Sequence, residues 1–145
     1  MNNNTGILYE LVYVSTAIRL FKEQQLKDLL VEARERNQAL SVTGMLLYKN
    51  QSFLQLLEGC KENVLKLYES IGRDKRHFRV KTLHEGYSQQ RKFENWAMGF
   101  QRLDDSDSSN LPGFTRFLHR DYDVDEISQM SGQAIELLLH FRKFS

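Results

Sequence analysis

The sequence predicts an α+β fold, because strand-like and helix-like segments alternate along its first two thirds. Several short segments are rich in aromatic and β-branched residues, which is typical of strands. Two longer segments instead carry apolar residues at helical spacing. Of the 145 residues, 41% are hydrophobic and 27% are charged, as expected for one soluble domain with an ordinary core.

The first two elements are a strand and a helix. Leu8–Ser15 is mostly aromatic or β-branched and is expected to be a strand. A helix is expected over Glu23–Asn37, with these apolar residues on one face: Leu26, Leu29, Leu30 and Ala33. Asn37 lies four residues beyond Ala33, so we expect it to extend the apolar face rather than the solvent face.

A hairpin and a second helix follow. Val42–Tyr48 and Ser52–Glu58 are expected to pair across a polar turn made of Lys49, Asn50 and Gln51. The second helix is predicted near Lys61–Arg73, with an apolar stripe of Val64, Leu67, Tyr68 and Ile71.

Two further strands complete the predicted sheet. They are Phe78–Tyr87 and Trp96–Leu103, separated by the polar stretch Ser88–Glu94. The order of elements is therefore βαββαββ, with a βαβ unit around each helix. This order predicts a ferredoxin-like sheet with both helices on one face.

The C-terminal part differs in composition from the rest. We predict a domain over 1–103, followed over 104–145 by an acidic loop and a C-terminal helical cap. Asn110, Leu111 and Pro112 suit the start of a helix bearing Phe114, Phe117 and Leu118. A last helix is expected between Asp125 and Arg142, carrying Ile127, Ala134, Leu138 and Phe141. This cap is expected to cover the sheet face that the core helices leave bare.

Composition excludes several classes of protein. A formal net charge of +1 gives no electrostatic reason to expect nucleic acid or an anionic membrane as partner. The longest apolar runs are far shorter than a membrane span, and the segment Met1–Thr5 is polar rather than signal-like. A single cysteine, Cys60, excludes an internal disulfide framework and a multi-cysteine metal site. Together these features favour the cytoplasm.

Three polar residues are predicted to point into the core. Gln55 lies within an apolar strand, and alternation places it on the same face as Phe53 and Leu57. A buried amide without hydrogen-bond partners costs about 1–3 kcal/mol, so other polar groups must form hydrogen bonds with it. Tyr13 and Asn37 are the candidates. Their partner is one another, a water molecule or a planar heterocycle, and the pattern alone does not choose among these. The set is a hydrogen-bonding cage without a nucleophile.

Two further groups have both an ordinary and a functional interpretation. Asp74, Arg76 and His77 follow the second helix, either as a solvated charged helix end or as a phosphate and sugar site. The sequence has no glycine-rich phosphate loop, so a nucleotide would be held by side chains and helix ends. Trp96 and Met98 share one face of the last predicted strand, which an ordinary core also explains. The four histidines are too scattered to indicate a metal site.

In series, these motifs resemble those of the BLUF family of flavin-based blue-light sensors. The resemblance runs from about Leu8 to Phe100. It rests on Leu-Val-Tyr13-Val-Ser15, Arg36-Asn37, Val-Thr43-Gly44-Met-Leu-Leu-Tyr, Phe53-Leu-Gln55-Leu-Leu-Glu58-Gly59, Gly-Arg73-Asp74-Lys-Arg76-His77 and Phe93-Glu-Asn-Trp96-Ala-Met98-Gly-Phe. It implies the same βαββαββ fold, with a flavin between the two helices. The expected flavin is FAD, with FMN or riboflavin as alternatives.

The resemblance also implies a role for each site residue. Tyr13 matches the photochemical tyrosine and Gln55 the switching glutamine. Asn37 matches a residue that binds the flavin ring, and Leu30 and Ala33, on the same helix face, are expected to contact the cofactor as well. Asp74, Arg76 and His77 match the ribityl and phosphate side. Trp96 and Met98 match a pair on the last strand that is linked to signal output.

The implied mechanism is a reversible hydrogen-bond switch. Light drives transfer of an electron and a proton from Tyr13 through Gln55, which is left rotated, tautomerised or both. After Phe100 about 45 residues remain, too few for a cyclase or phosphodiesterase domain. We therefore expect no enzyme activity, and signalling through a homo-oligomer or a protein partner. The alternative is a ferredoxin-like domain that uses flavin as an enzyme cofactor or stores it.

Overall fold

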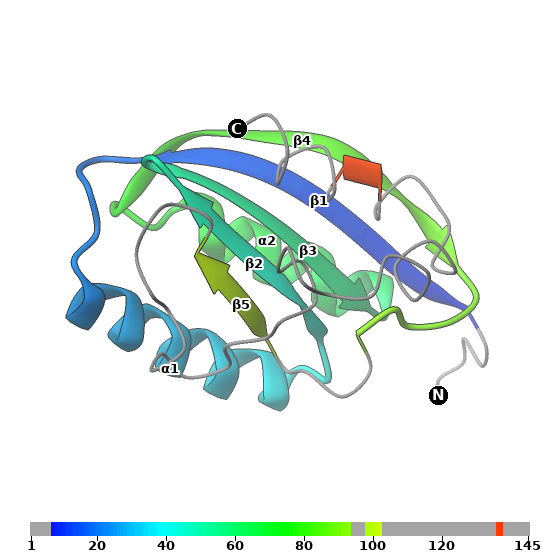
Figure 1. The fold of residues 1–145 in the computed structure, drawn as a ribbon. Coiled ribbons are helices and arrows are strands. Elements are labelled where there is room, and N and C mark those ends of the chain that lie inside the picture. Colours follow the sequence, from blue (N-terminus) through cyan, green and yellow to red (C-terminus); the bar gives the residue numbers. More distant parts are fainter. Residues whose placement is uncertain (1–6, 94–97, 103–135, 138–145) are drawn as a thin grey trace, which may run out of the picture.

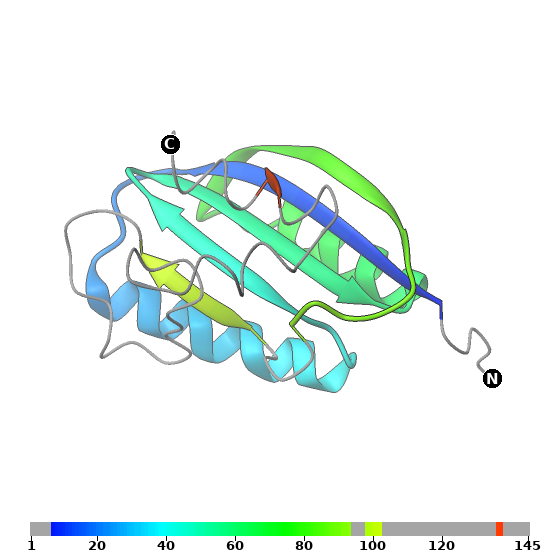
Figure 2. The ribbon, with the colours of Figure 1, turned by 45° about the vertical axis from the view of Figure 1, so that its right-hand side comes forward.

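The elements form a single sheet with two helices. The computed structural model describes residues 7–93, 98–102 and 136–137. Its elements are β1 (Leu8–Ala17), α1 (Glu23–Ala39), β2 (Thr43–Lys49), β3 (Ser52–Gly59), α2 (Lys61–Gly72), β4 (His77–Ser88) and β5 (Gly99–Arg102). Figures 1 and 2 show both helices running along the sheet. None of the described helices combines the length and apolar character that a membrane span requires.

The strand order confirms the ferredoxin-like prediction. The order across the sheet is β4-β1-β3-β2-β5. The pairs β1–β3, β1–β4 and β2–β3 are antiparallel, and β5 adds to the edge in parallel with β2. Helix α1 connects β1 to β2, and β3 lies between these two strands. Helix α2 connects β3 to β4, and β1 lies between them, so each helix crosses over one intervening strand. The strands β1 and β3, which carry Tyr13 and Gln55, are therefore neighbours in the interior of the sheet.

The apolar core lies between the helices and one face of the sheet, here called the helix face. Residues of α1, α2 and alternate positions of β1 and β3 share one buried cluster, among them Leu26, Leu67, Leu11, Leu57 and Tyr13. The opposite face of the sheet, here called the far face, is buried as well, through Val12, Met45, Leu47, Leu54 and Leu56. The sequences of β1, β2 and β3 are almost continuously apolar because the residues on both faces of these strands are buried.

A tight turn sets the register that brings the site together. Asn50 and Gln51 have φ of 49° and 69°, the positive values that a two-residue type I′ hairpin requires. The turn pairs Lys49 with Ser52 and places Gln55 opposite Leu46 on β2. On the other side, Gln55 lies opposite Tyr13 on β1. A slip by one residue would turn Gln55 to the far face.

Several predicted boundaries shift in the structure. β1 runs two residues beyond the predicted Ser15, and α1 ends at Ala39, so Asn37 lies inside its last turn. The carbonyl of Asn37 accepts the backbone N–H groups of Leu40 and Val42 at 3.1 and 2.9 Å, which closes the helix. The strand predicted at Trp96–Leu103 is seen at Gly99–Arg102. Trp96, the acidic loop and the predicted helical cap lie outside the described residues.

Candidate functional site

A pocket opens on the helix face of the sheet, between α1 and the end of α2. About 440 Å³ of space lies between its walls, a volume that includes the open solvent at its mouth. Its lining combines an apolar wall with polar groups: Tyr13, Phe21, Leu29, Ala33, Arg36, Leu46, Phe53, Gln55, Ile71, Asp74, Arg76 and His77. Six of the residues predicted from the sequence therefore meet in one cavity.

The centre of the site is a buried pair of side chains. The Tyr13 hydroxyl donates a hydrogen bond to the Gln55 amide oxygen, and the two residues are 3% and 4% exposed. The Gln55 amide nitrogen lies 3.3 Å from the Met98 sulfur. A thioether has no proton to donate, so the amide end that faces Met98 must be the NH₂ group. Gln55 thus has one strong partner and one weak one.

Burial keeps Tyr13 in its protonated form. Desolvation raises the pKa of the Tyr13 phenol well above its usual range, and the positive charge of Arg36 only partly opposes this. The ring packs against Tyr68 and His77, with centroids 5.4 and 6.3 Å away. The hydroxyl therefore remains a hydrogen-bond donor to Gln55 at any physiological pH.

Met98, which directly precedes β5, is buried and contacts both α1 and Gln55. Its side chain is 1% exposed, and its carbonyl accepts a hydrogen bond of 3.3 Å from the Arg34 guanidinium on α1. The sequence linked Met98 to signal output only through the family resemblance. The structure brings its sulfur against Gln55, while its predicted companion Trp96 falls outside the described residues.

Arg36 is a pocket residue that sequence reasoning did not select. Its Nε is the one buried side-chain nitrogen or oxygen without a hydrogen-bond partner in the described part of the chain. An unpaired buried polar group of this kind costs about 1–3 kcal/mol. A signal for it exists in the sequence: Leu29, Ala33 and Arg36 follow one another at helical spacing and line the same pocket.

Three predicted contacts on α1 behave differently from one another. Ala33 lines the pocket, and its small side chain leaves room beside α1. Leu30 is fully buried in the core and is not among the lining residues. Asn37 is 1% exposed, one turn beyond Ala33, and is likewise not part of the lining. Contacts of Leu30 and Asn37 with a ligand remain predictions.

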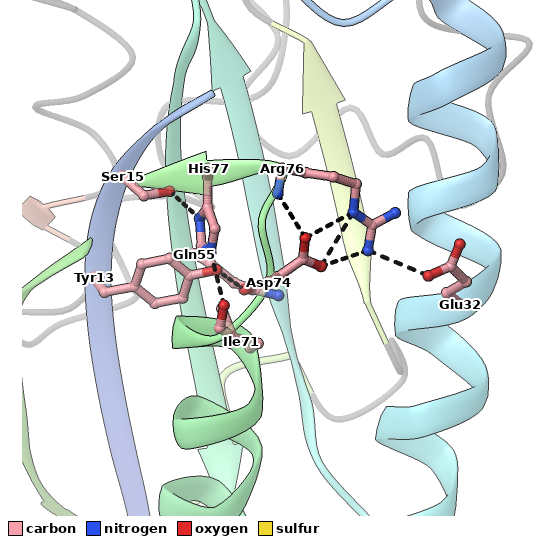
Figure 3. A network of polar contacts seen from close by, with 8 residues as sticks. All are labelled: Tyr13, Ser15, Glu32, Gln55, Ile71, Asp74, Arg76 and His77. Carbon is pink, nitrogen blue, oxygen red and sulfur yellow. Dashed lines mark hydrogen bonds and ion pairs between the residues drawn. The ribbon is translucent and has the colours of Figure 1, made fainter. Parts of the chain in front are cut away.

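The acidic and basic groups after α2 form an ion-paired network (Figure 3). The Arg76 guanidinium binds both carboxylate oxygens of Asp74, at 2.6 to 3.1 Å, and reaches Glu32 on α1 at 3.2 Å. These bonds from Arg76 hold the pKa of Asp74 below its usual value. Arg76 therefore meets two carboxylates, of which Glu32 was not anticipated from the sequence.

His77 is tied into the fold through both ring nitrogens. Nδ1 lies 2.7 Å from the Ser15 hydroxyl, and Nε2 lies 2.7 Å from the Ile71 carbonyl (Figure 3). A carbonyl can only accept, so Nε2 carries a proton. The ring lines the pocket and also fastens the end of α2 to β1. Its predicted contact with phosphate stays a prediction.

Comparison with known proteins identifies the class to which this fold and pocket belong. Residues 8–99 match the family model described as BLUF, sensors of blue light using FAD. This match covers more than half of the chain, so the chain belongs to the BLUF family. It is a flavin-binding sensor domain of the blue-light type.

Individual relatives show how this domain occurs elsewhere. The chain is 41% identical over 92 residues to the photoactivated adenylate cyclase subunit beta of Euglena longa, a match over 63% of this chain but only 11% of that protein. The structure of Klebsiella pneumoniae BlrP1 with FMN and cyclic diGMP is similar with a TM-score of 0.73 and 28% identity, over 94% of this chain and 35% of that one. The photo-activated state of BlsA is similar with a TM-score of 0.67 and 26% identity, over 95% and 96% of the two chains.

Proposed function

We propose that this pocket holds the flavin ring and that blue light switches the hydrogen bonds of Gln55. The observation that supports this most strongly is the buried series Tyr13–Gln55–Met98. It joins a potential electron and proton donor to an amide that lies at the pocket wall. On its NH₂ side the amide gives up only a weak contact when it changes orientation, and the Tyr13 hydroxyl can accept a hydrogen bond from the NH₂ group as well as donate one to the oxygen.

The donors around the pocket fit a flavin. An isoalloxazine is planar, apolar over much of its area, and carries carbonyls and ring nitrogens on one edge. The apolar wall of Phe21, Leu46 and Phe53 suits its faces. The unpaired Arg36 Nε and the Gln55 amide suit its polar edge. We propose Asn37 as a further contact to that edge, from its place one turn beyond Ala33.

The bound flavin supplies a ring that absorbs blue light and accepts an electron. Tyr13 then gives up an electron, which makes its hydroxyl strongly acidic, and the Gln55 oxygen lies in place to take the proton. Both electron and proton return to Tyr13, so no substrate is consumed. Gln55 is left in a new arrangement in which its amide donates toward the ring edge and no longer toward Met98. This arrangement is the signal.

The network after α2 is proposed to face the ribityl and phosphate side. Asp74 accepts hydrogen bonds and suits sugar hydroxyls, while Arg76 suits phosphate. Glu32 opposes a phosphate there, because it already occupies one N–H side of Arg76. FAD, the flavin in the family description, is our proposal for the native cofactor. FMN and riboflavin would use fewer of these contacts.

The output is proposed to be a change in assembly rather than catalysis. The family is one of sensors, and relatives such as the Euglena cyclase subunit join this domain to other activities. We propose that the lit state alters contacts with a protein partner or a second copy of the chain through the last strand and the C-terminal segment. The cytoplasmic location predicted from the composition, the short apolar runs, the polar N-terminal segment and the single cysteine also stays a prediction.

The direct test is the absorption spectrum of the purified protein. After reconstitution with FAD, blue light is expected to shift the long-wavelength flavin bands slightly to the red, and the shift should reverse in the dark. Two results would contradict a hydrogen-bond switch: bleaching of the oxidised flavin bands, or no change in the spectrum on illumination. Retention of the yellow colour on gel filtration tests binding separately.

A further inference from the structure

Two buried carboxylates lie side by side on the far face of the sheet. Glu58 follows Gln55 on β3 but points to the opposite face, and Glu10 lies directly across from it on β1. Their exposures are 1% and 6%. Like charges on facing residues of a sheet repel one another, and burial of a carboxylate is costly unless it is well paired. Their presence therefore calls for specific partners.

The segment that leaves β4 supplies those partners. The two oxygens of Glu58 accept the backbone N–H groups of Lys92 and Phe93 at 2.9 and 2.7 Å. The Thr43 hydroxyl donates to Glu58 as well, at 2.9 Å. The Lys92 ammonium lies 2.6 Å from Glu10, whose other oxygen is 2.9 Å from His84. Lys92 thus touches one carboxylate through its backbone and the other through its side chain.

The neighbouring residues fix the same segment. Arg91 donates to the carbonyls of Ser41 and Glu58 at 2.8 and 3.1 Å, and to the Thr43 hydroxyl at 2.9 Å. Phe93 is 2% exposed. Residues 91–93 are therefore held against the far face at the end where β2 begins and β3 ends. We call this segment the linker anchor.

The linker anchor limits where Met98 can lie. Phe93 and Met98 are five residues apart, which spans at most about 18 Å even when the chain is fully extended. Met98 is in turn held by Arg34 through its carbonyl and by Gln55 through its sulfur. Strand β3 therefore makes two contacts with the chain before β5. Glu58 binds the backbone of Lys92 and Phe93 on the far face, and Gln55 contacts Met98 on the helix face.

We propose that Glu58 is a positioning residue for Met98. Its carboxylate fixes the backbone at 92 and 93, and this holds the chain in the register that seats the Met98 sulfur against the Gln55 amide. The inference rests on the proposed switch at Gln55. When light removes the Gln55 contact, Lys92 and Phe93 stay in place, so the movement is expected at Met98 and β5.

The test compares two matched substitutions of neighbouring buried acids. In Glu58→Gln, one carboxylate oxygen becomes an NH₂ group, which cannot accept a backbone N–H. In Glu10→Gln, the same change breaks only side-chain contacts and leaves the backbone anchor. Both proteins are loaded with FAD and kept dark, and conversion of Met98 to the sulfoxide by dilute hydrogen peroxide is followed by peptide mass spectrometry.

The expected result separates the two variants. Met98 should be oxidised about tenfold faster in Glu58→Gln, the effect of losing one buried hydrogen bond on local opening. In Glu10→Gln it should stay within about twofold of the parent, and at equal melting temperatures this difference cannot come from global stability. The lifetime of the lit state should change with Glu58→Gln and not with Glu10→Gln. Thr43→Val, which removes a smaller part of the anchor, should act in the same direction and serves if Glu58→Gln does not fold.

Equal protection of Met98 in the parent and in folded Glu58→Gln would overturn the proposal. The proposal would also be overturned if Met98 were oxidised faster in both acid variants, in proportion to the drop in melting temperature of each. Because oxidation is measured in the dark, this result is independent of the light response. A parent protein without a red shift would refute the proposed switch and leave the anchor to be judged on Met98 alone.

Discussion

The two faces of β3 carry buried polar groups of opposite character. On the helix face, Gln55 is neutral, has one strong partner and one weak partner, and lines the same pocket as Arg36, whose Nε has no hydrogen-bond partner. On the far face, both carboxylate oxygens of Glu58 accept well-formed hydrogen bonds. The same strand thus holds an incomplete polar set on one side and a complete one on the other.

This difference separates a site from a structural contact. Buried polar groups in folded proteins are almost always paired, so an unpaired group at a cavity wall is consistent with the flavin contact proposed for it. A saturated cluster needs nothing further and serves to fix backbone positions. We therefore expect substitutions on the helix face to change flavin binding and the photochemical step itself. Substitutions on the far face should change stability and, through the position of Met98, the lifetime of the lit state.

Gln55→Leu should have the largest effect, the complete loss of the light-induced red shift. Leucine fills similar space but cannot take a proton or donate to the flavin, and the Tyr13 hydroxyl loses its partner. Flavin should still bind, and stability should fall by about 1–3 kcal/mol. Steady-state difference spectra on flavin-loaded protein measure this. A full and reversible shift in the variant would refute the role of Gln55.

Tyr13→Phe should also abolish the normal red-shifted state, because only the hydroxyl is removed and the ring packing remains. The dark spectrum should stay close to that of the parent. The fluorescence lifetime of the bound flavin should rise as its electron donor is lost. Time-resolved fluorescence tests this, with Tyr48→Phe as a control that removes another buried hydroxyl, one that accepts the Phe21 N–H at 3.0 Å. A normal photocycle in Tyr13→Phe would mean that another residue is the donor.

Arg36→Met should affect the empty and the loaded protein in opposite directions. Without flavin, removal of an unpaired buried nitrogen should leave stability equal or higher. With flavin, affinity should fall about tenfold or more, as for a charge-assisted hydrogen bond. Thermal melts with and without FAD give both values, since ligand stabilisation follows affinity. A variant that is destabilised equally in both states would return Arg36 to a purely structural role.

Arg76→Ala and Glu32→Gln should have the smallest effects, and these should depend on the flavin used. Loss of the partly exposed Arg76 should weaken FAD about three- to tenfold and leave riboflavin nearly unchanged. Glu32→Gln removes a competing carboxylate and should strengthen FAD by a few-fold at low salt. Titration calorimetry with the two flavins measures both. Equal changes for FAD and riboflavin would show that this network does not face phosphate.

The sequence was informative where one simple rule decides the outcome. Strand alternation predicted that Gln55 points inward, and helical spacing predicted the buried position of Asn37. The hairpin turn at Asn50 and Gln51 followed from its polar residues. These are local patterns, and the confirmed strand order rests on them together with the rule that helices cross over to parallel strands.

Other features depend on contacts between distant segments and could not be derived in this way. Lys92 lies in a stretch read only as polar, yet it joins Glu10 and Glu58 from two different strands. His77 looked available for phosphate, but Ser15 and Ile71 engage both of its nitrogens. Charged residues in a polar loop give no sign of such partners until the register of the sheet is known.

The proposed switch requires that light change the hydrogen bonds of the Gln55 amide. Light-minus-dark infrared difference spectra of flavin-loaded protein, with natural and with isotope-labelled glutamine, report on this directly. We predict side-chain amide bands that move with the label in the parent protein and vanish in Gln55→Leu, alongside the red shift. A red-shifted flavin whose difference spectrum contains no glutamine-sensitive band would refute a hydrogen-bond switch at Gln55.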